Sequence, residues 1–351
     1  VAQQQILAPD LKESLDSIYK LSRRLTKKMM AQTKKCSHLN CAMAFLAVLL
    51  VTCCISSSSA LAFTVNKPTE VSWSNRLGVT LTPIATGVWA AERPFVWNSI
   101  DVGGRSVICR VGDGTLLVHS PVEWTAELGE CLDALGGGVG HIVSPNYEHL
   151  KYASQWHAQY PEAKMYACPG LPDRMPDVTW DCELGVDPIP PELEGSIDLV
   201  YFDCEINPFT RKPFFNEINL FHVNSKSIIM TDTFWNYPSS DVPNYASVME
   251  QNGINTFHEC PKMPVEGAPV NKKLPSVVVP FGSKAWKFGM DRVYLPFYKK
   301  FMVGNGKRRP KFDNVVQKIL NWDADMIVPC HGDVIRGKDL CQDVLKTHFY
   351  G

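Results

Sequence analysis

Short apolar runs alternate with segments of helical spacing through the middle of the chain, and this order constrains the fold more than any other feature. Helical patterns at residues 123–135 and 147–159 separate strand-like runs, and Gly112-Asp-Gly114 marks a hairpin between two of those runs. A strand, helix, strand order requires helices to pack on the faces of a sheet, so it predicts a layered α/β fold. The expected strands are residues 87–91, 106–111, 115–119, 141–144, 165–168, 198–202, 217–222, 227–231 and 326–328, and a last helix is expected at 313–322.

Composition excludes several classes of function. The 35 Lys and Arg residues are balanced by 36 Asp and Glu residues, which leaves a formal net charge of −1, whereas proteins held to nucleic acid by charge carry a basic surplus. A hydrophobic content of 45% excludes a disordered chain. Neither a Walker loop nor a Gly-x-Gly-x-x-Gly turn after a strand is present, so nucleotide cofactors are not expected. We expect a globular protein that does not act on nucleic acid.

The first 62 residues have the pattern of a presequence. Lys34-Lys35 precede an apolar run of 14 residues at 42–55, and Ala60-Leu61-Ala62 follows a run of serines. This apolar run is shorter than the roughly 20 residues of a membrane span. We therefore expect a signal peptide at about residues 30–62, cleavage after Ala62 and no transmembrane helix in the mature chain. A start at Val1 instead of Met indicates an over-extended or fragmentary N-terminus.

The residues after the cleavage site bear on localisation and domain organisation. Phe63 directly follows the Ala-x-Ala exit, which resembles the signal and transit boundary of algae with complex plastids. The resemblance implies import into such a plastid, with secretion as the alternative. Residues 63–351 are expected to form one domain with a long Pro-rich insertion at about 236–312. We interpret the basic run at 307–311 as a solvated loop, with contact to an anionic surface as the second interpretation.

Acidic and histidine residues follow three of the expected strands directly. Glu148-His149 follow the strand at 141–144, Asp232 follows 227–231, and His331 follows 326–328. Open α/β sheets bind ligands at such strand ends, and imidazole with carboxylate is a ligand set for zinc, iron or manganese. Each residue alone is more typical of a turn or a packing contact than of a metal site, so the prediction depends on their recurrence at strand ends.

Two adjacent pairs place a histidine beside a hydroxyl or a thiol. They are His119-Ser120 and Cys330-His331. Adjacent strand residues point to opposite faces, and no Gly-x-Ser-x-Gly motif is present. We therefore do not expect nucleophilic catalysis from either pair.

Longer blocks around these positions resemble a known family. The segments at 141–156, 160–171, 215–232 and 320–332 resemble domain-of-unknown-function family 4336. These are metallo-β-lactamase-like domains of cyanobacteria, algae and plants. The resemblance covers roughly residues 75–345 and implies the four-layer αββα sandwich of metallo-hydrolases.

The same resemblance implies a degenerate metal motif. Distant enzymatic relatives of the family carry His-x-His-x-Asp-His, and the matching positions here are Ser144, Asn146, Glu148 and His149. The relatives' mid-chain histidine also has no counterpart, so the ligands of the first metal are absent. Those of the second metal correspond to Glu148, His149, Asp232 and His331, while Ser144, Asn146 and Glu217 are expected to line the cleft.

Two interpretations of this set remain. In the first, the protein is a non-catalytic or strongly divergent member in which His149 and His331 brace Asp232 without a metal. In the second, one zinc, iron or manganese ion serves a mononuclear hydrolase, although Glu148 is one methylene longer than the usual aspartate. The catalytic residues, the substrate, any small-molecule ligand and any protein partner stay open in both.

Overall fold

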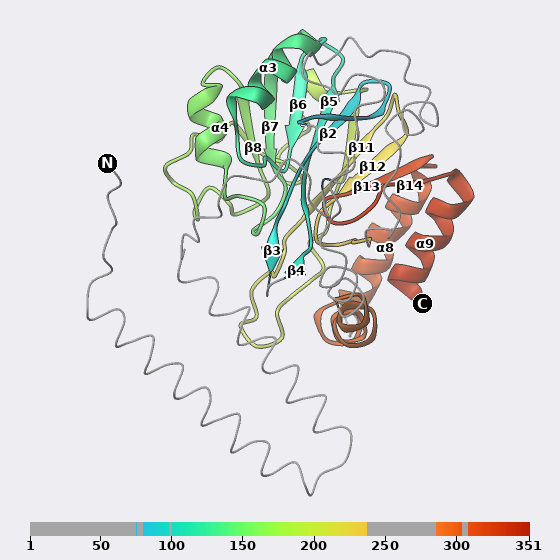
Figure 1. The fold of residues 1–351 in the computed structure, drawn as a ribbon. Helices are drawn as coiled ribbons and strands as arrows, with labels where there is room; N and C mark the ends of the chain where they lie inside the picture. Colours follow the sequence, from blue (N-terminus) through green and yellow to red (C-terminus); the bar gives the residue numbers. More distant parts are fainter. Residues whose placement is uncertain (1–74, 76–79, 98–99, 237–285, 304–307) are drawn as a thin grey trace, which may run out of the picture. The chain divides into compact units, whose positions relative to one another are not determined.

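The computed structural model describes residues 75, 80–97, 100–236, 286–303 and 308–351 (Figure 1). The predicted presequence with its cleavage after Ala62, and most of the predicted insertion, lie outside the described residues. Contacts divide the chain into two compact units, residues 1–64 and 65–351. All described elements and hydrophobic cores belong to the second unit, which therefore holds a complete core of its own.

The first sheet of the described fold has seven strands in the order β1-β2-β5-β6-β7-β8-β9. Its first four strands pair antiparallel, and the step from β6 to β9 is parallel throughout. The predicted hairpin is confirmed, because Arg110 of β5 pairs with Leu116 of β6. The strands are β1 (Thr82–Ala85), β2 (Val88–Arg93), β5 (Gly104–Arg110), β6 (Leu116–His119), β7 (Val139–Ser144), β8 (Lys164–Ala167) and β9 (Cys182–Glu183), and β3 (Val96–Trp97) and β4 (Ile100–Asp101) form a separate small pair.

The second sheet has the order β10-β11-β12-β13-β14. All its neighbours are antiparallel except β12 and β13, which run parallel with Met230 beside Pro329. Because these two strands end side by side, the residues that follow them, Asp232 and His331, start from the same edge. The strands are β10 (Ile197–Tyr201), β11 (Ile218–His222), β12 (Ser227–Met230), β13 (Met326–Pro329) and β14 (Ile335–Arg336).

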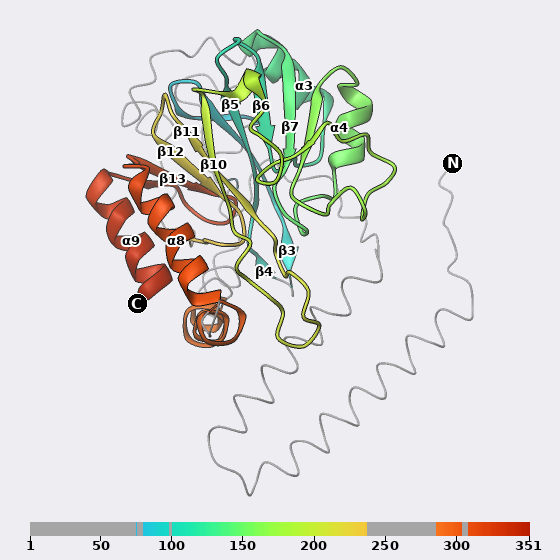
Figure 2. The same ribbon diagram turned by 180° about the vertical axis from the view of Figure 1, so that it is seen from behind.

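The two sheets pack face to face between two helical layers. Val107, Leu117 and Val143 of the first sheet share one core with Leu220 and Val328 of the second. α3 (Ala126–Leu135) and α4 (Ala153–Gln159) cover the outer face of the first sheet. α8 (Arg308–Asn321), α9 (Lys338–Tyr350) and the helical turns η3 (Met290–Tyr294), α7 (Leu295–Phe297) and η4 (Tyr298–Met302) cover the second, as Figures 1 and 2 show from opposite sides. The predicted αββα sandwich is confirmed by these contacts.

Helix boundaries show where the sequence pattern was misleading. The helix predicted at 147–159 begins only at Ala153, because the side chain of Asn146 accepts the N–H groups of Glu148 and His149 and forms a turn there. α8 begins at Arg308 and not at 313, so residues 308–311 of the basic run form its first turn, where Pro310 is tolerated. α9 was not predicted, although its buried residues, Cys341, Leu345 and Phe349, recur at every fourth position. Among the described helices, none has the length and apolar character needed to cross a membrane.

Candidate metal centre

Three side chains from distant parts of the sequence meet at one edge of the sandwich. The candidate ligand atoms of His149, Asp232 and His331 all lie within 4.8 Å of one another. His149 Nε2 is 3.2 Å from Asp232 Oδ2, and His331 Nε2 is 3.5 Å from Asp232 Oδ1. The three side chains retain 14%, 16% and 15% exposure, so the cluster is sheltered but reachable from solvent.

Strand pairing explains why these residues meet. Asp232 and His331 each lie two residues beyond the paired ends of β12 and β13, Met230 and Pro329. His149 belongs to the turn after β7 in the opposite sheet, and its ring centroid lies 5.4 Å from that of His331. Each sheet therefore contributes ligands from its own strand ends to one site between them.

The two imidazoles have matching orientations. His149 Nδ1 lies 2.6 Å from Ser120 Oγ, and His331 Nδ1 lies 2.6 Å from the carbonyl oxygen of Gly103. A carbonyl can only accept, so His331 carries its proton on Nδ1 when neutral and presents the Nε2 lone pair to the cluster. Metal-binding histidines are usually held in this way, with one ring nitrogen tied to an oxygen and the other free to ligate.

Asp232 lies between the two rings and interacts strongly with His149. Burial would raise the pKa of Asp232, but the positive charge of His149 and the close contacts of both imidazoles hold that pKa well below its usual value. Burial would lower the pKa of His149, yet Asp232 outweighs it and raises that pKa well above 6.5. The metal-free pair is therefore a carboxylate beside an imidazolium at neutral pH.

A buried carboxylate fixes the loop that carries Asp232. Glu217 is fully buried in the position just before β11, and it accepts the N–H groups of Thr231, Asp232 and Thr233 at 2.7, 2.7 and 2.9 Å. The hydroxyl of Thr233 donates a further hydrogen bond of 2.8 Å. Burial and the nearby charge of Asp232 raise the pKa of Glu217, while these donors stabilise its ionised form.

Asn146 links the loops that carry His149 and Asp232. Its Oδ1 accepts the N–H groups of Glu148 and His149 at 3.0 and 2.8 Å, and its Nδ2 donates to Asp232 Oδ2 at 2.7 Å. The same Nδ2 lies 3.2 Å from Glu217 Oε2. One amide therefore sets the spacing between two of the three candidate ligands.

The remaining residues predicted from the sequence lie around this cluster. Glu148 is exposed and is not one of the three clustered residues, and desolvation of its carboxyl and the charge of Asp232 raise its pKa. Ser144, Asn146 and Glu217 are all fully buried, so none of them lines an open surface. Ser144 Oγ has no hydrogen-bond partner within the described part of the chain.

Sequence reasoning missed several residues at the site. Ser120 has a left-handed backbone (φ 53°), and its hydroxyl contacts His149 and not the adjacent His119. His119 is fully buried, and neither of its ring nitrogens has a hydrogen-bond partner among the described residues. Burial lowers the pKa of this imidazole to about 3. The exposed ring of Phe95 lies 6.4 Å from the ring of His331. Ser120 could have been found by the same signal as the ligands, because it directly follows an apolar strand.

The geometry of the three candidate ligands fits one metal ion. Ligands of a tetrahedral ion at about 2.1 Å lie about 3.4 Å apart. His149 Nε2 lies 3.2 Å from Asp232 Oδ2, and His331 Nε2 lies 3.5 Å from Asp232 Oδ1, so both distances are close to that spacing. Two histidines and one carboxylate suit zinc, iron or manganese. With three protein ligands, at least one coordination position would stay open to solvent or substrate.

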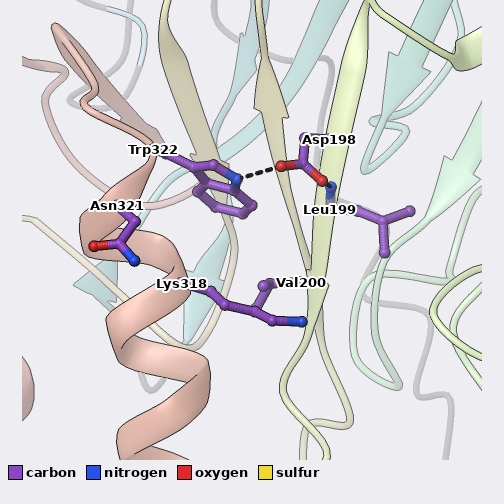
Figure 3. A pocket seen from close by; sticks show the side chains of 6 residues that line it. All are labelled: Asp198, Leu199, Val200, Lys318, Asn321 and Trp322. Atoms are coloured by element: carbon purple, nitrogen blue, oxygen red, sulfur yellow. Dashed lines mark hydrogen bonds between the residues drawn. The ribbon is translucent and has the colours of Figure 1, made fainter.

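A separate cavity lies on the outer side of the second sheet. It has a volume of about 310 Å³ and lies between the edge strand β10 and the end of α8 (Figure 3). Trp322 Nε1 donates to Asp198 Oδ2 at 2.7 Å, and the indole stacks on Phe221. None of the three clustered residues lines it. The lining residues are Asp198, Leu199, Val200, Lys318, Asn321 and Trp322.

Comparisons with known proteins identify one family. The model of the family described as "Domain of unknown function (DUF4336)" matches residues 86–273. No curated protein matches the sequence.

Several solved structures are similar at low sequence identity. A metallo-β-lactamase from Pontibacter korlensis is 11% identical with a TM-score of 0.44, over 78% of this chain and 100% of that one. FIM-1 from Pseudomonas aeruginosa in its mono-zinc form is 15% identical with a TM-score of 0.42, over 81% and 99%. The metal-soaked Flv1 flavodiiron core from Synechocystis is 11% identical with a TM-score of 0.46, over 77% and 60%.

Proposed function

The chain belongs to the DUF4336 family, and from the geometry of its site we propose that it binds one divalent metal ion through His149, Asp232 and His331. One observation carries this proposal: both imidazoles direct Nε2 to the same carboxylate while an oxygen holds each Nδ1. The neutral tautomer that this arrangement favours at His331 is the one that ligates metal through Nε2.

In the competing interpretation no metal binds, and His149 and His331 only hold Asp232 in place. The distances between these side chains favour a bound metal. His331 Nε2 lies 3.5 Å from Asp232 Oδ1, which is long for a hydrogen bond but ordinary for two ligands of one ion. A carboxylate and an imidazolium removed from water must also recover a large desolvation cost. A bound divalent cation would compensate Asp232 more fully than two imidazoles can, and the residual exposure of the three side chains provides an entry path.

We propose hydrolysis as the reaction class of this centre. A divalent ion with an open position lowers the pKa of bound water and polarises the scissile group. Glu148 lies beside His149 at the surface, and its carboxyl is the group we assign to accept and return the proton. Desolvation and the charge of Asp232 raise the pKa of this carboxyl above its usual value. Asn146 and Glu217 keep Asp232 in place and are too buried to contact a substrate.

A Ser120–His149–Asp232 relay is the second candidate, because Ser120 Oγ lies only 2.6 Å from His149 Nδ1. The raised pKa of His149 opposes it, since an imidazolium cannot accept the serine proton. The serine therefore accepts a hydrogen bond from Nδ1, which is the role expected beside a metal ligand.

Metal analysis of the 65–351 unit tests the proposal. After exposure to zinc, iron or manganese and removal of excess, mass spectrometry should find about one ion per chain, and His331→Ala should abolish it. His222→Ala is the matched control, because His222 is a buried histidine bound to Ser225 and Arg110 away from the cluster. A chelator should lower the melting temperature of the parent and of the control, but not that of His331→Ala. A metal content near zero together with indifference to chelator would refute the metal site and the hydrolase with it.

A further inference from the structure

A basic surface with exposed aromatic rings lies where a loop meets the helical segment over the second sheet. The loop at 203–216 and the segment at 286–303 are joined by a hydrogen bond of 3.1 Å from Ile206 N–H to the Met302 carbonyl. Figures 1 and 2 both show this yellow-green loop beside the orange segment. We call this the basic aromatic surface, defined by Phe209, Arg211, Lys212, Lys300, Phe301 and Arg308.

The loop holds Phe209 in solvent by its own hydrogen bonds. Asn207 Oδ1 accepts the N–H groups of Phe209 and Thr210 at 2.9 and 3.2 Å. The Asn207 N–H donates to the Lys212 carbonyl, and its carbonyl accepts the Arg211 N–H, both at 2.9 Å. The loop is therefore a closed turn, and the ring at its tip is 70% exposed. A single exposed apolar residue is ordinary on a protein surface, so a contact surface is indicated only together with the second ring and the cations near this loop.

The helical segment adds a second exposed ring and further positive charge. Phe301 is 40% exposed, and the Lys300 ammonium lies 5.4 Å from its ring centroid. Arg308, in the first turn of α8, donates from Nη2 to the Phe301 carbonyl at 3.2 Å. These contacts place two cationic groups next to the second ring.

The cations of this surface lack acidic partners, unlike others nearby. Lys311 pairs with Asp203, and Arg309 pairs with Asp313 at 2.9 Å. Within the described part of the chain, no ion pair with a carboxylate is formed by Arg211, Lys212, Lys300 or Arg308. Because the whole chain has a net charge of −1, this positive charge is a local feature and not the consequence of a basic protein.

We propose that the basic aromatic surface binds the face of an anionic lipid bilayer. Phenylalanine rings stabilise such binding by entering the boundary between headgroups and acyl chains, while lysine and arginine contact the anionic headgroups. A projecting turn with an exposed ring at its tip suits insertion into a bilayer surface. Double-stranded DNA would use the cations, but its stacked bases would leave the Phe209 tip with no apolar environment. The proposal is independent of the metal centre, whose residues lie on other loops.

Vesicle sedimentation with the 65–351 unit tests this proposal. The protein should bind vesicles of phosphatidylcholine with phosphatidylglycerol much more tightly than vesicles of phosphatidylcholine alone, and added salt should weaken binding. Lys212→Glu and Lys300→Glu should each weaken binding by at least about fivefold, the value of one lost cation. Phe209→Ser should weaken it by about tenfold or more, through lost burial of the ring.

Matched controls distinguish binding through this surface from nonspecific adsorption to vesicles. Val186→Ser removes an apolar side chain that is 67% exposed after β9, and Lys151→Glu reverses an exposed cation before α4. Both controls should bind like the parent, and melting curves should show all variants folded. Equal binding to neutral and anionic vesicles, or equal losses in the controls, would overturn the proposal. So would binding to double-stranded DNA that Phe209→Ser leaves unchanged while vesicle binding is absent, or a concentration-dependent dimer that buries this surface.

Discussion

The carboxylate of Glu217 accepts the backbone N–H of Asp232 at 2.7 Å, so a fully buried residue before β11 directly fixes the central acid of the metal centre. Two acidic groups in such proximity repel each other. The arrangement persists because Glu217 also accepts the N–H groups of Thr231 and Thr233, whose hydrogen bonds offset the repulsion.

We therefore expect Glu217→Gln to destabilise the protein. Oxygens on both sides of the carboxylate accept N–H groups, so an amide must turn its NH₂ toward at least one donor. We expect a loss of about 2–3 kcal/mol in the free energy of unfolding of the metal-free protein at pH 7, measured by urea denaturation. Metal affinity should fall as well, because Asp232 loses its fixed position.

Glu205→Gln provides the matched control. Glu205 is also buried, but its Oε1 alone accepts the N–H groups of Phe215 and Asn216. An amide can keep its oxygen at that position and carries no proton that must be lost on unfolding, so the change should not destabilise the protein at pH 7. Equal losses in the two variants would contradict the role assigned to Glu217.

Glu205 also predicts a dependence of stability on pH. Desolvation raises its pKa from 4.5 to about 8, although backbone N–H donors partly oppose the shift. Between these two values the folded protein retains a proton that the unfolded chain has released, so this group's contribution to stability falls as pH rises. Glu205→Gln should remove that fall, on the order of 2–5 kcal/mol between pH 5 and 9. Parallel stability curves for parent and variant across this range would show that Glu205 is ionised in the folded protein.

Ser120 is predicted to strengthen metal binding by orienting His149. Ser120→Ala removes the oxygen 2.6 Å from His149 Nδ1, and loss of such a partner typically weakens metal binding 10–100-fold. Competition titration with a chromophoric zinc chelator measures this effect. Ser225→Ala is the control, because it removes a 2.7 Å contact with His222 Nδ1 of the same kind away from the cluster. Unchanged zinc affinity in Ser120→Ala would show that this hydrogen bond does not orient the ligand.

The layered fold could be predicted because hydrophobic pattern and chain order determine it together. Apolar runs such as 141–144 and 227–231 place their ends at one edge of a sheet, and for this reason Asp232 and His331 could be assigned to one site from the sequence. The same logic reaches Ser120, which follows β6 and pairs through its N–H with Val143 of β7. The sequence pairs Ser120 with its neighbour His119 and does not indicate that its hydroxyl contacts His149.

The direction of side chains in turns could not be predicted from the sequence pattern. Glu148 and His149 are adjacent, and only the turn made by Asn146 decides that His149 enters the cluster while Glu148 remains exposed. Asn146 itself was interpreted as the position of a lost ligand. Its amide in fact connects the two loops, a role that depends on contacts between residues far apart in the sequence.

The ion pair at the site predicts opposite pH effects with and without metal. The pKa of His149 is raised above 6.5, so its contribution to the stability of the metal-free protein is complete below about pH 6.5 and is lost as pH rises through the raised value. The pKa of Asp232 is lowered from 3.8, so its contribution is present above about pH 3.8 and is lost as pH falls through the lowered value. The metal-free protein should therefore gain most from the pair between about pH 4 and 6.5. His149→Gln should lower its stability most in this range and remove the fall in stability above pH 6.5. Metal binding requires His149 to release its proton, so zinc should stabilise the parent increasingly as pH rises above 6.5. Melting temperatures measured across pH with chelator and with zinc check both signs, and a zinc effect that is constant across pH would exclude His149 as a ligand.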